Sequence, residues 1–123
     1  MDRRVQRVIF LMKNNLYHEI QLTDMARVVG LSPSRLRHMF KAHINKTPTQ
    51  YLSHLRMQEA KEQLETTSLS VKEIMTSVGV SDPSNFTRAF KRAYGLTPTQ
   101  LRSRVKIIVL FVASLTLDVL KDF

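Results

Sequence analysis

The chain has 123 residues and contains neither cysteine nor tryptophan. Without cysteine it can form neither a disulfide framework nor a cysteine-ligated metal site, which agrees with a reducing compartment. Its longest unbroken apolar run, residues 107–113, is far shorter than the roughly 20 residues that a membrane-spanning helix needs. A secretory leader is not expected either, because Arg3, Arg4 and Arg7 interrupt the N-terminal apolar pattern.

Acidic residues are missing from two long stretches, one between Asp24 and Glu59 and the other between Asp82 and Asp118. Both stretches are rich in lysine and arginine, and the whole chain has a formal net charge of +9. A small basic chain with few aromatic residues typically meets a polyanion, most often nucleic acid. The composition therefore favours a nucleic-acid-binding protein.

The tetrapeptide TPTQ occurs twice, at residues 47–50 and 97–100. A threonine followed three residues later by glutamine forms a capping box, in which each residue's side chain bonds the other's backbone N–H. Proline at the first helical position gives up an N–H that has no partner there. Each copy is therefore predicted to begin a helix.

The sequences around the two copies align as well. With one extra residue near Asp82, the alignment superposes Gly30 on Gly79, Phe40 on Phe90, and Lys41 on Lys91. The chain is thus a duplicated unit of about fifty residues. Two copies are too few for a solenoid, which stacks at least three repeats.

Each unit predicts two helices joined by a tight turn. In the first unit, Thr23 is the expected N-cap of one helix, Gly30 ends that helix, and Ser32 caps the next. In the second unit the corresponding positions are Ser70, Gly79 and the pair Asp82 and Pro83. Helix, short glycine turn and helix is the helix-turn-helix pattern.

Helical spacing separates two faces on the second helix of each unit, about residues 33–44 and 83–94. The faces predicted to lie in the core contain Leu36, Met39, Phe40, His43 and Ile44 in one copy, and Phe86, Ala89, Phe90, Ala93 and Tyr94 in the other. The opposite faces carry Ser34, Arg37, His38 and Lys41, and Ser84, Thr87, Arg88 and Lys91. Short hydroxyls and long donors of this kind can read base edges in the major groove and bind phosphates.

Residues 47–66 predict one long helix between the units, with an apolar stripe formed by Tyr51, Leu52, Leu55, Met57, Ala60 and Leu64. At ~1.5 Å per residue such a helix is nearly 30 Å long. Successive major grooves on one side of B-DNA are about 34 Å apart. One chain is therefore expected to place both second helices in successive grooves.

The chain resembles the DNA-binding domain of the AraC/XylS family of bacterial transcription regulators, over about residues 5–104. The segment VGVSDPSNFTRAFKRAYGLTPTQLR carries the resemblance best, and YLSHLRMQEAKEQL fits the family's linker helix. Val80 and Asn85 depart from the family pattern, which commonly has larger or aromatic residues there. The resemblance implies an all-α fold of seven helices, with two helix-turn-helix subdomains (1–46 and 67–104) joined by the linker helix (47–66).

The resemblance also implies roles for individual residues. Ser34, Arg37 and His38 would face bases from the first unit, with Arg35 near the DNA backbone. Ser84, Asn85 and Arg88 would face bases from the second unit, and Thr87 lies on the same face. Phosphate contacts or support of the fold are expected of Lys41, Lys91 and Arg56.

The small stand-alone members of the family imply a cytoplasmic, nucleoid-associated protein of a bacterium that acts as a monomer on promoter DNA and contacts RNA polymerase. A helical adaptor that binds RNA polymerase or another protein without reading DNA is the alternative function. Catalysis, a metal and a cofactor are not expected, because His18, His38, His43 and His54 are scattered and no phosphate-binding glycine loop is present. His43 is expected to be a partly buried packing residue.

Residues 105–123 form an apolar C-terminal tail that does not belong to the family pattern. Strand, helix and disorder all remain open from the sequence. An exposed apolar segment of this kind indicates a contact surface. The tail is therefore predicted to dock on the protein's own surface or on another copy, rather than on a membrane.

Overall fold

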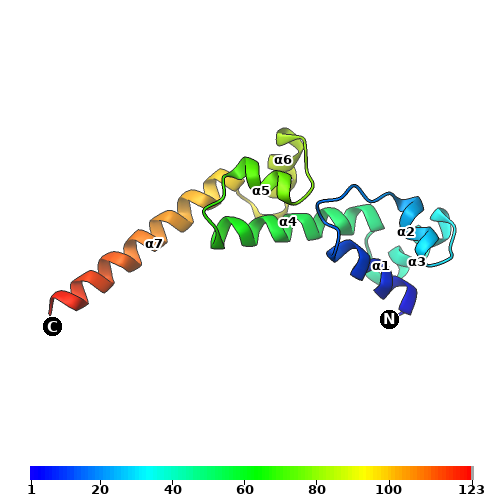
Figure 1. Cartoon of the computed structure of the whole chain (residues 1–123), viewed down its shortest axis with the longest axis horizontal. Coiled ribbons are helices and arrows are strands. Elements are labelled where there is room, and N and C mark those ends of the chain that lie inside the picture. Colours follow the sequence, from blue (N-terminus) through cyan, green and yellow to red (C-terminus); the bar gives the residue numbers. More distant parts are fainter. Residues whose placement is uncertain (123) are drawn as a thin grey trace.

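The computed structural model describes residues 1–122, and within them the chain forms seven helices and no strand (Figure 1). The helices are α1 (Arg3–Lys13), α2 (Leu22–Val28), α3 (Pro33–Ile44), α4 (Pro48–Thr66), α5 (Val71–Ser77), α6 (Pro83–Tyr94) and α7 (Pro98–Lys121). The predicted all-α fold, with two helix-turn-helix units joined by a long helix, is confirmed. Phe123 lies outside the described residues.

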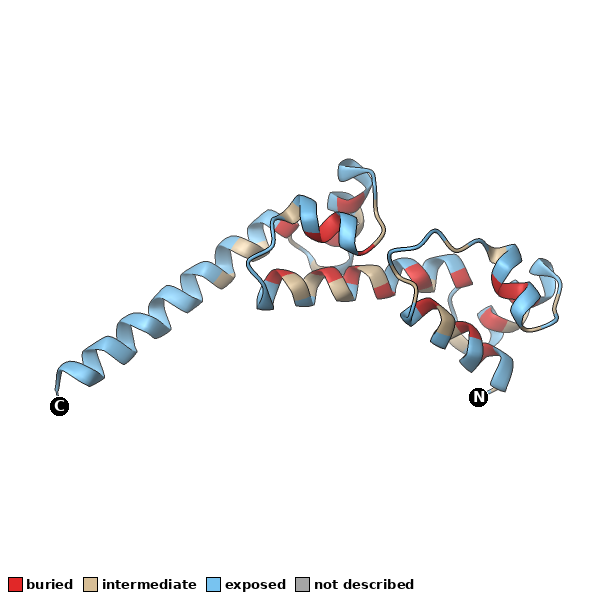
Figure 2. Ribbon diagram, in the orientation of Figure 1, coloured by how far each residue is buried: buried red, intermediate tan, exposed pale blue. Residues whose placement is uncertain are grey.

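Helix α4 connects the two units and contributes to the core of each (Figure 2). Its first half supplies Leu52 and Leu55 to the core of the first unit, and its second half supplies Met57, Ala60 and Leu64 to that of the second. The other buried members are Val5, Val8, Met12, Met25, Ala26, Leu36 and Phe40 in the first core, and Ile74, Met75, Val78, Phe86 and Phe90 in the second. The division of the chain after residues 46, 66 and 104 stays a prediction.

Local capping fixes where the helices begin. Both TPTQ copies form the predicted capping box: the Thr47 Oγ1 accepts from the Gln50 backbone N–H at 3.2 Å, and the Thr97 Oγ1 accepts from Gln100 at 3.1 Å. The prediction for Thr23 is wrong, because α2 begins earlier, with Gln21 as its N-cap. The Asp24 carboxylate lies three residues after Gln21 and accepts its backbone N–H at 3.3 Å.

Replacing Thr47 by alanine is expected to lower the free energy of unfolding by about 1 kcal/mol, because the substitution removes the acceptor for the Gln50 N–H. Urea unfolding measures this change. Thr49→Ala is the matched control, because Thr49 is exposed on the same helix and is not the cap. Equal losses for the two variants would contradict the capping role.

The predicted core faces of α3 and α6 are correct except at one position in the last turn of each helix. Leu36, Phe40, Phe86 and Phe90 are buried, and Met39, Ile44, Ala89 and Tyr94 are half-buried. His43 and Ala93, which occupy equivalent positions, are exposed. Each lies in the last turn of its helix, and helical spacing gives the direction of a side chain but not how far the neighbouring helices extend.

Helix α7 continues without a break through residue 104 into the tail, so of the three open structures the tail adopts the helical one. Pro98 is buried and Leu101, Arg102 and Val105 are half-buried beside the body, but the helix then projects away from it (Figure 1). Leu110, for example, is 69% exposed. Docking of the tail on the protein's own surface is therefore wrong.

The apolar tail does not make α7 a membrane-spanning helix. Of the helices formed by residues 1–122, none combines the length and the apolar character needed to cross a membrane.

Candidate nucleic-acid interface

Each second helix begins at a cap directly after a tight turn. Gly30 and Gly79 adopt positive φ angles of 69° and 80° and end the first helices. The Ser32 hydroxyl then accepts from the Arg35 N–H at 3.2 Å, and the Asp82 carboxylate accepts from the Ser84 N–H at 2.9 Å. These short-range bonds fix the start of α3 and of α6, and thus the direction in which their outer faces point.

The outer face of α3 is entirely exposed to solvent. Leu36 and Phe40 anchor the helix on the first core, which turns the opposite side outward. The predicted residues Ser34, Arg35, Arg37, His38 and Lys41 are all exposed on α3. The Lys41 ammonium group donates to the Asn45 carbonyl at the end of the helix, at 3.2 Å.

The outer face of α6 is also polar and basic, although it differs from that of α3 at several equivalent positions. Phe86 and Phe90 anchor the helix on the second core, and the predicted residues Ser84, Asn85, Thr87, Arg88 and Lys91 are exposed. The Arg88 Nη2 donates to the Asn85 Oδ1 at 2.6 Å. This bond holds the guanidinium group toward the N-terminal end of α6, the end that carries the short hydroxyl of Ser84.

Arg56 lies apart from these two faces. Its side chain is half-buried against the loop between α1 and α2, where Nε donates to the Leu16 carbonyl at 2.9 Å and Nη2 to the His18 carbonyl at 3.0 Å. Burial lowers the pKa of the Arg56 guanidinium, and the nearby Glu19 carboxylate partly offsets this effect. Of the two roles expected for Arg56, this geometry matches support of the fold.

Two cations that the sequence analysis did not select lie between the units. Lys46 and Arg92 line a groove between α4 and α6, together with Gln50, His54 and other residues. Both residues lie in the two sequence stretches that lack acidic residues, and this position in the sequence could have identified them as candidates for DNA binding. Within residues 1–122 the ion pairs are Asp2–Arg4, Asp24–Arg27 and Lys61–Glu65, so no carboxylate pairs with a cation of α3, α6 or this groove.

Two helix-turn-helix units on one chain, each with an exposed basic second helix, define a tandem helix-turn-helix protein. A family model described as a helix-turn-helix domain matches residues 25–104. The chain belongs to the AraC/XylS family of bacterial transcription regulators.

The chain is similar to several curated regulators. It is 37% identical over 86 residues to the raffinose operon transcriptional regulatory protein RafR of Pediococcus pentosaceus, a match that covers 70% of this chain and 31% of RafR. It is 34% identical over 101 residues to the activator RhaR of Mannheimia succiniciproducens, covering 82% of this chain and 37% of RhaR. The chain thus spans about a third of the length of these relatives.

Solved structures show the same fold. An AraC-type transcriptional regulator from Chromobacterium violaceum superposes with a TM-score of 0.78 at 26% identity, covering 84% of this chain and 92% of that one. The DNA-binding domain of AdpA, solved in complex with a target DNA, superposes with a TM-score of 0.80 at 22% identity, covering 85% and 94%. At this identity the second likeness shows the fold alone.

Proposed function

We propose that the chain binds double-stranded DNA in a sequence-specific manner and regulates transcription, with α3 and α6 in successive major grooves. The observation that carries this proposal is the pair of exposed outer faces on two equivalent helices: each begins with a serine, ends with a lysine and carries further cationic or hydrogen-bonding side chains between them. A merely solvated basic helix would account for one such face. It gives no reason for a polar, basic outer face to occur in the same structural position of both units.

The residue types suggest which side chains contact base edges and which contact phosphates. Arg37 and Arg88 are suited to the bidentate contact with guanine, and the Asn85 amide holds the Arg88 guanidinium in place. Lys41 and Lys91 lie a turn farther along their helices and suit phosphate contacts. The remaining members of the proposed interface are Ser34, Arg35, His38, Ser84 and Thr87, with Arg56 as a supporting residue.

The length of α4 supports binding by a single chain. Its 19 residues extend over about 28 Å, close to the ~34 Å between successive major grooves. A dimeric helix-turn-helix protein reaches two grooves through its symmetry axis. In this chain the internal duplication takes the place of that axis, and an asymmetric site is expected.

Membership of the family supports regulation of bacterial promoters from the cytoplasm, on the nucleoid, as the biological setting. Contact with RNA polymerase is part of the proposal on the same ground. A binding role without catalysis follows from it, because the proposed interface works by contact alone.

Selection of bound sites from a random duplex pool at ~0.15 M salt tests the proposal. Enrichment of an asymmetric site with two blocks about one helical turn apart is the expected result. Binding without enrichment, which only fades as salt rises, would contradict it and favour the adaptor alternative.

The tail is proposed to mediate contact between copies of the chain, because its apolar side chains are exposed on a helix that projects from the body. Phe111→Lys is expected to shift the chain toward the monomer in sedimentation at matched concentration, since it places a charge in the apolar surface. Thr116→Lys adds the same charge without removing an apolar group and serves as control. Equal sedimentation of wild type and both variants at all concentrations would contradict the proposal.

A further inference from the structure

The loop between α1 and α2 touches both α4 and the second helix-turn-helix unit. Residues 16–18 of this loop accept two hydrogen bonds from Arg56, at the middle of α4. Leu16 itself packs against the core of the first unit. The loop is therefore held by the first unit on one side and by α4 on the other.

Gly79 brings the turn of the second unit against the same loop. A Cβ atom at Gly79 would overlap the Leu16 carbonyl oxygen and lie 3.0 Å from the Tyr17 Cα. Both neighbours are backbone atoms, so neither can rotate away as a flexible side chain would. Only glycine permits this approach of the two chain segments.

The close contact at Gly79 occurs only in the second unit, as a comparison with Gly30 in the first unit shows. Gly30 occupies the equivalent position in the first unit and has a similar positive φ of 69°. No atom lies within 4 Å of a Cβ built on Gly30. The requirement for glycine at position 30 is therefore one of backbone conformation, whereas at position 79 close packing adds to it.

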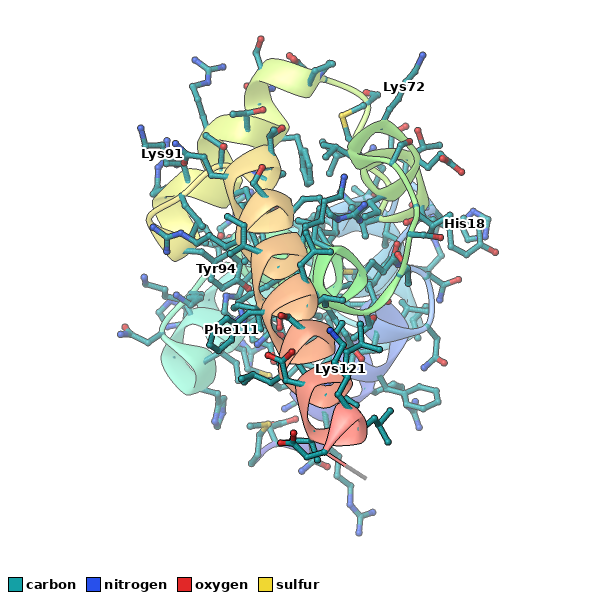
Figure 3. All side chains as sticks on the ribbon, turned by 90° about the vertical axis from the view of Figure 1, so that its left-hand side faces the viewer. His18, Lys72, Lys91, Tyr94, Phe111 and Lys121 are labelled. Atoms are coloured by element: carbon teal, nitrogen blue, oxygen red, sulfur yellow. The ribbon has the colours of Figure 1, made fainter. Side chains whose placement is uncertain are left out.

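The contact lies away from the proposed DNA-binding face. In Figure 3, which looks along α7, His18 in the loop and Lys91 on α6 lie on opposite sides of the molecule. A substitution in the loop, such as one at His18, therefore touches no residue of the proposed DNA-binding face directly.

We propose that residues 16–18, Arg56 and Gly79 form an inter-unit contact that fixes the position of α6 relative to α3, and so sets the spacing of the two DNA blocks that the chain recognises. The inference rests on the proposed DNA-binding function. Helix α4 alone is one connection about which the units can bend or twist. The inter-unit contact adds a second connection beside it, and two connections define a fixed geometry.

A distance measurement tests the contact without DNA. The chain has no cysteine, so Ser34→Cys and Ser84→Cys place one spin label on α3 and one on α6 with no background labelling. A narrow distance distribution is expected for the otherwise unaltered chain and for Gly30→Ala. Gly79→Ala and Arg56→Met are expected to broaden the distribution or shift its maximum, with the helical circular dichroism retained. The same distribution in all four proteins would overturn the proposal.

A DNA spacing series then tests the consequence. The selected site is synthesised with its two blocks at the selected spacing and with one base pair removed or added. Gly79→Ala is expected to bind the selected spacing about tenfold more weakly, or ~1.4 kcal/mol, and to discriminate less among the three spacings. Gly30→Ala is expected to keep the wild-type preference, and identical preferences in the two variants would overturn the proposal. Failure of the wild type to select two blocks would instead reject the DNA-binding function and leave the distance measurement as the test of the contact.

Discussion

Replacing Arg37 and Arg88 together by alanine is expected to weaken binding to the selected DNA site by roughly 30-fold to 10⁴-fold. A bidentate arginine–guanine contact contributes about 1–3 kcal/mol of discrimination, and the two losses add because the residues belong to different units. Both side chains are exposed and neither contributes to a core, so the fold is expected to remain intact. Titration of labelled duplex, with circular dichroism as the check on folding, measures the effect.

Charge alone would also weaken binding, and a matched variant separates the two causes. Arg3→Ala with Arg7→Ala removes the same number of charges from exposed positions on α1, a helix that contributes no residue to the proposed interface. This variant is expected to lose affinity equally for the selected site and for random duplex, since it changes only the general attraction to phosphates. If Arg37 and Arg88 behaved in the same way, with no loss of preference for the selected site, their proposed role in reading bases would be wrong.

The fold was largely predictable because its helices begin and end at local signals. The TPTQ boxes, Ser32, Ser70 and the two turn glycines each act within a few residues, and the helices observed at Pro33–Ile44 and Pro83–Tyr94 have the predicted bounds. Thr23 failed as a cap because Asp24 favours Gln21 by a competing bond of the same kind. Local capping and turn signals therefore predicted most helix boundaries and failed at α2, where two such signals competed, while the helical structure of residues 105–121 was left open.

The outer faces of α3 and α6 were predictable for a related reason. Once Leu36, Phe40 and their equivalents are assigned to the core, the periodicity of the helix determines which residues lie opposite. The exposure of His43 and Ala93 was not predictable, because it depends on where the neighbouring helices end. Asn85, which departs from the family pattern, accepts a hydrogen bond from the Arg88 guanidinium, and the periodicity of the helix alone did not predict that bond.

The inter-unit contact could not be predicted from the sequence. Arg56 lies 40 residues from Leu16, and no periodicity or motif connects the two. From the sequence, Gly79 and Gly30 are both predicted simply to end a helix. Only the arrangement in space separates them, by placing a backbone carbonyl beside one glycine and open solvent beside the other.

Replacing Phe90 by alanine is expected to lower the free energy of unfolding by about 3–5 kcal/mol, the usual cost of removing a buried aromatic side chain. Phe90 is fully buried and its ring packs against Tyr94 and Phe86, with centroids 5.0 and 6.1 Å away. Phe10→Ala is the matched control, because the Phe10 side chain is 69% exposed and its removal is expected to cost less than about 0.5 kcal/mol. Urea unfolding measures both changes.

The Phe90→Ala substitution is expected to destabilise the first unit as well, although Phe90 belongs to the second. Each core has only eight or nine buried residues, and a domain of about 60 residues is marginally stable by itself. Because α4 supplies residues to both cores, its C-terminal half cannot unfold without exposing the end of its N-terminal half. Amide exchange in α3 should therefore accelerate in Phe90→Ala together with exchange in α6. Unchanged protection of α3 would mean that the two cores unfold separately and that α4 joins them without coupling their stability.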